Sequence, residues 1–270
     1  MRKLLLIGIG AGDPDHLTLQ AIDALNAVDL FVVFEKENGS ELSEARRQIR
    51  ERFVRRADYR LLEIVDPPRD RAAADYTGAV RDWRDARARE LERVLATELG
   101  PDGSAGILVW GDPALYDGTI RIVEWILEQG RLELDYEVIP GISSVQVLTA
   151  RHRIPLNQVA RPVQITTGRR LREGLPAGVD DVVVMLDAGL ACSELRTEPG
   201  WHIYWGAYLG TKDEALVAGP LDEVIDEIQE TRRALRERKG WIMDTYLLRR
   251  AAPDPAAPDP AAPDPDSVTG

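Results

Sequence analysis

The stretch KLLLIGIGAGDP, residues 3–14, decides how this chain folds. Its apolar run indicates a strand buried on both faces, as in a parallel sheet covered by helices. The glycines after it let backbone come close to a ligand, and Asp-Pro is typical of the first turn of a helix. A second Gly-Asp-Pro, residues 111–113, follows another apolar run, 107–110. Because loops at the carboxyl ends of parallel strands bind small molecules in α/β proteins, the two copies predict a ligand cleft.

The rest of the chain alternates short apolar runs with longer helical patterns, which is typical of an α/β fold. The expected strands are 3–9, 29–34, 60–65, 106–110, 136–139, 162–166, 182–186, 202–207 and 215–218, with a last apolar stretch at 241–248. The expected helices are 18–27, 71–99, 118–129, 142–151 and 221–238. The first helix is expected to begin at Asp13-Pro14-Asp15. The closer spacing of strands in the second half favours antiparallel pairing there.

This pattern predicts two α/β domains, residues 1–139 and 140–250, divided at Pro140-Gly141. In the helix expected at 71–99, the apolar stripe is Val80, Trp83, Leu91, Val94 and Leu95. The Arg, Asp and Glu runs of that helix are interpreted as a solvated face. Residues 251–270 repeat Ala-Ala-Pro-Asp-Pro, which lacks apolar side chains to offset its ordering entropy, so a disordered tail is predicted.

Composition narrows the class of protein. The 270 residues have 44% hydrophobic content and a formal charge of −12, four of these charges being tail aspartates, which argues against nonspecific nucleic-acid binding. No apolar stretch approaches the roughly 20 residues that span a bilayer, and the first residues lack a signal-peptide cleavage pattern. We therefore expect a cytoplasmic protein without a membrane partner. Its one cysteine, Cys192, excludes an internal disulfide and a cysteine-cluster metal site, and no metal is expected.

The glycine loops can be tested against known cofactor motifs. No Gly-x-x-x-x-Gly-Lys-Ser/Thr occurs, so there is no P-loop. Gly8, Gly10 and Glu35 fit a dinucleotide fingerprint, but Asp13 stands at the third glycine, where it would repel a pyrophosphate. A nicotinamide-dependent oxidoreductase therefore remains an alternative. A phosphate-free, positively charged cofactor such as S-adenosylmethionine fits the acidic loops better.

Four segments carry a more specific resemblance: GIGAGDPDHLT (8–18), GDPALY (111–116), VIPGISS (138–144) and VAGPL (217–221). In this order they resemble the tetrapyrrole methylases. Within that family the closest similarity is to enzymes that act on a late corrin precursor, carried by 4–10, 16–21, 34–36 and 240–249. Only the tail lies outside the resemblance.

The resemblance implies two α/β domains, a homodimer, and S-adenosylmethionine in the cleft between the domains. It places the cofactor contacts on Ala11, Trp110, Gly111, Asp112, Leu115, Ser143, Ser144, Leu186 and Leu209. The family often has Pro, Gly and Met where this chain has Ala11, Trp110 and Leu186. Backbone contacts would survive these changes, whereas side-chain contacts would differ.

The implied reaction is methyl transfer to C-1 of precorrin-5 with hydrolytic release of acetate, a step of cobalamin biosynthesis that gives precorrin-6A. Acyl hydrolysis needs a general base and a hydrogen-bond donor, for which Glu35, and Tyr116 or His16, are the candidates. The substrate is a polycarboxylate, and its candidate cations are Lys36, Arg46, Arg47, Arg151, Arg153, Arg169 and Arg170. Methylation of another corrinoid and noncatalytic tetrapyrrole binding remain alternatives.

Overall fold

The computed structural model describes residues 1–35, 41–68, 76–175 and 178–250, with the side chains of 35, 41, 42, 76 and 77 excepted. The tail predicted at 251–270 lies outside the described residues. The chain divides into two compact units: residues 1–154 with 206–215, and residues 155–205 with those from 216 onward. No helix in the described ranges is both long and apolar enough to cross a membrane.

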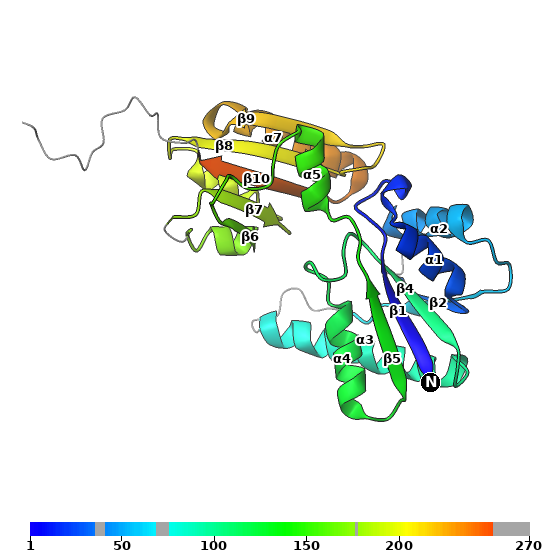
Figure 1. The fold of residues 1–270 in the computed structure, drawn as a ribbon. Helices are drawn as coiled ribbons and strands as arrows, with labels where there is room; N and C mark the ends of the chain where they lie inside the picture. The colour runs from blue at the N-terminus through cyan, green and yellow to red at the C-terminus, as the bar shows by residue number, and fades with distance from the viewer. Residues whose placement is uncertain (36–40, 69–75, 176–177, 251–270) are drawn as a thin grey trace, which may run out of the picture. The chain divides into compact units, whose positions relative to one another are not determined.

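The first unit is built on a five-stranded sheet with the order β3-β2-β4-β1-β5 (Figure 1). The pairs β1–β4, β1–β5, β2–β3 and β2–β4 are all parallel. Its elements are β1 (Arg2–Gly8), η1 (Pro14–His16), α1 (Leu19–Ala27), β2 (Leu30–Glu35), α2 (Glu41–Phe53), β3 (Arg60–Val65), α3 (Tyr76–Glu98), β4 (Ser104–Val109), α4 (Thr119–Gln129), β5 (Leu134–Ile139) and α5 (Ser144–His152).

The central strand β1 is buried on both faces. Leu4 and Leu6 pack with α3 and α4, whereas Leu5 and Ile7 pack with α1 and α2. Consecutive side chains of a strand point to opposite faces, so the apolar run fills two cores at once. The connection from β1 leads past β4 to β2, and the one from β4 leads past β1 to β5. The carboxyl ends of β1 and β4 therefore form a topological switch point, where α/β sheets bind ligands.

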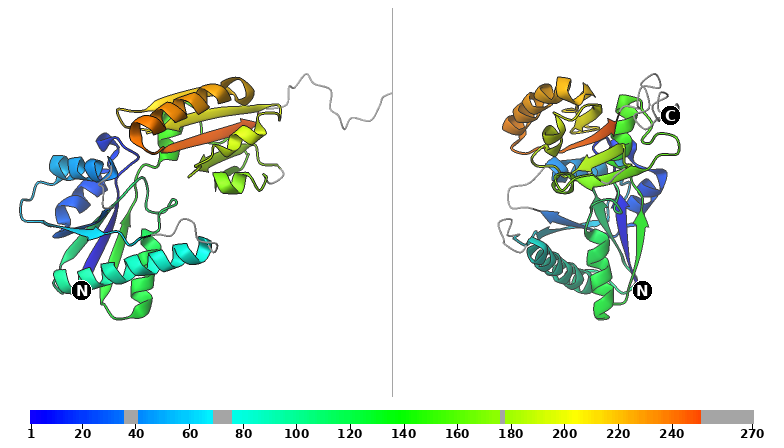
Figure 2. Two further views of the ribbon diagram at one scale, coloured as in Figure 1. Left: turned by 180° about the vertical axis from the view of Figure 1, so that it is seen from behind. Right: turned by 90° about the vertical axis from the view of Figure 1, so that its left-hand side faces the viewer.

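The second unit contains a mixed sheet with the order β6-β7-β10-β8-β9. Its elements are β6 (Val163–Thr167), α6 (Gly168–Leu171), β7 (Asp181–Met185), η2 (Ala191–Leu195), β8 (Trp201–Ala207), β9 (Ala215–Pro220), α7 (Leu221–Lys239) and β10 (Asp244–Arg250). Strand β10 is antiparallel to β7, which confirms the antiparallel pairing expected here, while β6 is parallel to β7. Figure 2 shows α7 lying along one face of this sheet.

A buried polar network holds the second unit together. Arg232 of α7 donates to the Asp244 carboxylate at 2.7 Å and to the carbonyl of Ala188 at 3.2 Å. On the other side of the loop after β7, the Tyr246 hydroxyl donates to Asp187 at 2.6 Å and accepts from the backbone N–H of Cys192. These bonds fix the loop after β7 to α7 and β10.

The strands and most helices agree with the sequence predictions to within a few residues. Two local expectations are corrected. First, α1 begins at Leu19 with Thr18 as its cap, whereas Asp13 caps the short helix η1 by accepting from the N–H of Asp15. Second, α2 was not predicted, because its charged sequence has few apolar positions to indicate a buried face.

Candidate functional site

The loops after β1, β4 and β5 meet backbone to backbone at the switch point. The N–H of Gly111 donates to the carbonyl of Gly10 at 2.9 Å, and Gly10 returns the bond at 3.2 Å. A Cβ on Gly141 would overlap the carbonyl oxygen of Gly111 and lie 2.8 Å from the carbonyl carbon of Gly8. Position 141 requires glycine because no side chain fits between these three backbone segments.

Asp112 ties two of these loops together. One carboxylate oxygen accepts from the N–H of Ala114 at 2.8 Å, and the other accepts from the N–H of Gly141 at 2.9 Å. At the start of the following helix, α4, the hydrogen-bond acceptor is instead Asp117, whose carboxylate accepts from the N–H of Thr119. Asp112 therefore does not cap α4, and its side chain fixes the relative position of the second and third loops.

The segment between β8 and β9 packs on the first loop. A Cβ on Gly12 would lie 2.6 Å from the carbonyl oxygen of Leu209, and one on Gly210 would lie 2.8 Å from the nitrogen of Asp13. The Glu214 carboxylate accepts from the N–H of Gly210 at 2.6 Å. Ala11 and Leu209 are 2% and 4% exposed. Two of the predicted contact positions, 11 and 209, thus lie on neighbouring segments of the first unit.

The two predicted serines begin helix α5. Ser143 is its cap: the hydroxyl accepts from the N–H of Val145 at 3.2 Å, and Gln146 completes a capping box. Ser144 is the first helical residue. The Cα of Ser143 lies 3.9 Å from the position of a Cβ on Gly111. The partly positive start of a helix, which favours an anionic group, therefore adjoins the second glycine loop.

The remaining predicted cofactor residues are spread over both units. Trp110 and Leu115 flank Gly111 and Asp112 and are half-buried. Leu186 belongs to the second unit, directly after β7, and is 67% exposed with a φ of 52°. A left-handed backbone is unusual for leucine and turns the chain sharply at the end of the strand.

Three residues were proposed as catalytic. Glu35 ends β2, where it pairs in register with Val65, and its side chain lies outside the described residues. Tyr116 has a φ of 53° and is 45% exposed, and partial burial raises the pKa of its phenol above 10.0. The Nε2 atom of His16 lies 4.0 Å from the Asp13 carboxylate, while its Nδ1 is buried without a hydrogen-bond partner among the described residues.

The candidate cations have different surroundings. Arg47 forms exposed ion pairs with Glu44 and Glu51, each at 2.6 Å, and Arg151 pairs with Glu214 at 2.9 Å. The others are Lys36, which lies outside the described residues, Arg153, which caps the end of α5, and Arg169 and Arg170 on α6, of which Arg170 pairs with Glu173. Arg46 lines a cavity.

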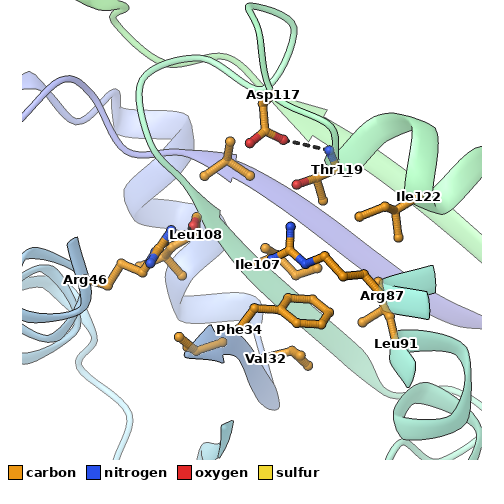
Figure 3. A pocket seen from close by; sticks show the side chains of 12 residues that line it. Val32, Phe34, Arg46, Arg87, Leu91, Ile107, Leu108, Asp117, Thr119 and Ile122 are labelled. Carbon is orange, nitrogen blue, oxygen red and sulfur yellow. Dashed lines mark hydrogen bonds between the residues drawn. The ribbon is translucent and has the colours of Figure 1, made fainter. Parts of the chain in front are cut away.

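That cavity, of about 140 Å³, lies at the carboxyl ends of β2 and β4 (Figure 3). It is lined by Val32, Val33, Phe34, Arg46, Arg87, Leu91, Ile107, Leu108, Val109, Asp117, Thr119 and Ile122. The sequence interpretation missed Arg87, Asp117 and Thr119. It assigned every charge of α3 to a solvated face, which is wrong for Arg87, since that side chain is only 19% exposed. A signal was present: Arg87 stands four residues from both Trp83 and Leu91, on the apolar stripe itself.

Comparison with known proteins shows similarity along most of the chain. A profile of the tetrapyrrole (corrin/porphyrin) methylases matches residues 3–225. The precorrin-6A synthase [deacetylating] of a Sinorhizobium species is 51% identical over 253 residues, which cover 93% of this chain and 97% of that protein.

Solved structures agree as well. The protein CobF of Corynebacterium diphtheriae, described as related to cobalamin synthesis, is 37% identical with a TM-score of 0.81, covering 93% of this chain and all of the other. The uroporphyrin-III C-methyltransferase of Thermus thermophilus, 20% identical, has a TM-score of 0.59 over 92% of each chain and shares the fold. The fold, the order of the glycine segments and the matching profile together establish that this chain belongs to the tetrapyrrole (corrin/porphyrin) methylases.

Proposed function

We propose that this chain is an S-adenosylmethionine-dependent C-methyltransferase that methylates precorrin-5 at C-1 and releases acetate, giving precorrin-6A in cobalamin biosynthesis. The observation that carries this proposal is the 51% identity to a deacetylating precorrin-6A synthase along nearly the full length of both chains. Relatives named for cobalt-precorrin-2, uroporphyrinogen III and cobalt-precorrin-4 are much more distant, at 26%, 24% and 25% identity.

The first unit suits S-adenosylmethionine better than a dinucleotide. Gly10, Gly111 and Gly141 carry no side chains, so a ligand can come close to the backbone there. Their N–H groups are bonded within the loops, but the carbonyl oxygens of Gly10 and Gly111, which accept one bond each, keep a second lone pair for a ligand. The carboxylate of Asp13 disfavours a pyrophosphate, whereas the cofactor's sulfonium is positively charged. We assign the cofactor to Ala11, Trp110, Gly111, Asp112, Leu115, Ser143, Ser144 and Leu209 of the first unit and Leu186 of the second.

When bound, the cofactor supplies a methyl group that is already activated for transfer. What remains for the chain is positioning, since holding the accepting carbon in line with that methyl group provides much of the acceleration. The bonds from Asp112 to Ala114 and Gly141 hold the second and third loops in fixed relation, which is what such positioning requires. For the hydrolytic step, Glu35 is our candidate base and Tyr116 and His16 are our candidate donors.

We further expect a homodimer, as the family resemblance implies, and a cytoplasmic location, for the reasons given in the sequence analysis. Light scattering coupled to gel filtration tests the dimer: a mass of about twice that of the chain supports it, and a monomer contradicts it.

The function is tested by offering the purified chain a panel of precorrins with S-adenosylmethionine and identifying the products by mass spectrometry. We expect S-adenosylhomocysteine and precorrin-6A from precorrin-5, and no methylation of earlier precorrins. Methylation of an earlier precorrin alone would transfer the assignment to another corrinoid methyltransferase. Binding without turnover would indicate a noncatalytic tetrapyrrole-binding protein. Tight binding of NAD⁺ in place of S-adenosylmethionine would indicate an oxidoreductase.

A further inference from the structure

The cavity of Figure 3 occupies a gap in the sheet of the first unit. Strand β2 pairs with β4 at Leu30↔Ala105 and Phe31↔Gly106, and the described pairing ends there. Strand β4 continues its pairing with β1 as far as Gly8↔Val109. Beyond Gly106 the two strands therefore separate, and the cavity of about 140 Å³ lies between their carboxyl ends.

Two guanidinium groups extend into this gap from opposite faces of the sheet (Figure 3). Arg46 comes from α2, and its Nε donates to the carbonyl of Leu108 at 3.1 Å. Arg87 comes from α3, and its guanidinium carbon lies 4.1 Å from the ring centre of Phe34 and 4.7 Å from that of Trp83. These contacts hold both groups at the cavity wall in fixed orientations.

The surroundings of Arg87 favour a further oxygen ligand. Its Nε lies 3.0 Å from the Asp66 carboxylate without hydrogen-bond alignment, and both atoms are buried with no hydrogen-bond partner in the described part of the chain. Burial lowers the pKa of Arg87, and the charges of Asp66 and Asp117 oppose that shift. A charged donor in such a dry setting binds an acceptor oxygen more strongly than an exposed arginine does.

The other walls define the size and polarity of the ligand. Asp117 and Thr119, at the start of α4, add an acceptor and a hydroxyl, while Val32, Ile107 and Val109 are apolar. The lining holds two guanidiniums and one carboxylate, that of Asp117, and Arg87 also lies close to Asp66, which is outside the lining. A lining with this small excess of positive charge suits a small ligand with one or two acceptor oxygens. A cavity of about 150 Å³ can bind benzene, so there is room for a two-carbon group.

We propose that this cavity binds a two-carbon acyl group, whose oxygen accepts from Arg46 and Arg87 and whose methyl group lies against Val32, Ile107 and Val109. Its ligand is either the acetyl substituent of the substrate or free acetate. Binding of the acetyl substituent rests on the proposed function, whereas binding of free acetate does not. The cavity adjoins the candidate cofactor loop along the chain, because Val109 precedes and Asp117 follows the segment Gly111–Asp112.

The first test measures binding of ¹³C-labelled acetate to the full chain by NMR titration. We compare the unchanged protein with Arg46→Met and Arg87→Met. Arg93→Met is the matched control, since Arg93 lies on α3, as Arg87 does, and forms an ion pair with Glu90 at the surface. Arg87→Lys keeps the charge but loses the planar fork, and serves if Arg87→Met does not fold.

We expect saturable binding that chloride does not displace, weakened about tenfold or more in the Arg46 and Arg87 variants and unchanged in Arg93→Met. Absence of saturable binding, or equal binding in all variants, would refute an acetate site.

The second test uses precorrin-5 and S-adenosylmethionine and identifies the source of the acyl group. If the cavity holds the acetyl substituent, Arg46→Met and Arg87→Met raise the KM for precorrin-5 and slow acetate release, while Arg93→Met does neither. If acetate binds but these variants keep the KM of the unchanged protein, the cavity holds free acetate. If the unchanged protein binds acetate but does not convert precorrin-5, the proposed function fails and the cavity site stands. Turnover with no acetate binding and no KM effect refutes the cavity site alone.

Discussion

At the scale of single residues, Asp112 has two hydrogen bonds that the sequence did not indicate. The Gly-Asp-Pro pattern identified the residue, but its partner Gly141 stands 29 positions away. Only the folded sheet brings the two together, so residue type and spacing could predict the loop and not the bond across it. Arg87 is a different case, because its position on the apolar stripe of α3 was visible in the sequence, whereas its contact with Phe34 of β2 is known only from the fold.

Removing the Asp112 carboxylate should weaken the join between the second and third loops. Asp112→Ala leaves the N–H groups of Ala114 and Gly141 without their acceptor, so we expect the free energy of unfolding to fall by about 1–3 kcal/mol. Asp112→Asn keeps one acceptor oxygen and should lose less. Urea denaturation measures both, with the exposed Asp23→Ala as the control. If Asp112→Ala were as stable as that control, the two hydrogen bonds of the carboxylate would not stabilise the packing of the second loop on the third.

Cys192 provides a test of burial in the second unit. Burial raises the pKa of its thiol to about 12, so the thiolate needed for alkylation is scarce in the folded chain. Because the folded pKa is raised, the thiol's stabilising contribution is complete below its unfolded pKa of about 8.5 and is lost as the pH rises from there toward the folded value. At about pH 8 we expect iodoacetamide to react with the urea-unfolded chain and not with the native one. Equal rates in the two states would contradict the packing around Cys192.

At the scale of elements, the apolar runs predicted β1, β2 and β4 because the side chains of each of these strands fill two cores at once. Helix α2 could not be predicted in the same way. Its buried side rests on few apolar residues, Ile49 and Phe53 among them, within a charged sequence. The start of α1 was misplaced because Asp13 and Thr18 are both suitable caps, and only the intervening η1 separates their roles.

Because three loops meet at Gly141, a side chain at this position should destabilise the fold. A Cβ there would overlap the backbone of Gly111 and Gly8, neither of which can move as a side-chain end could. We expect Gly141→Ala to lower the free energy of unfolding by about 3 kcal/mol or more, and to weaken S-adenosylmethionine binding because the glycine loops are displaced. Gly118 is the matched control, since nothing lies within 4 Å of its Cβ position. A Gly141→Ala protein as stable as Gly118→Ala would show that the loops do not pack this closely.

At the scale of the whole molecule, the sequence predicted two α/β parts and the family to which the chain belongs. It did not predict that residues 206–215 would pack with the first unit, because the contacts of Leu209 with Gly12 join positions far apart in the chain. The motif positions nevertheless included Leu209 beside Ala11. Family motifs therefore indicate which distant segments lie together in the fold, whereas local hydrophobic periodicity predicts only single helices and strands.

The central claim is that one chain couples methyl transfer to acetate release, and one measurement tests it directly. The protein is incubated with precorrin-5 and S-adenosylmethionine labelled in its methyl group, and labelled macrocycle and free acetate are followed together through the time course. We predict that one equivalent of acetate appears for each methyl group transferred and that the product is precorrin-6A. Methylated product that retains its acetyl group, or acetate released without methyl transfer, would contradict the account.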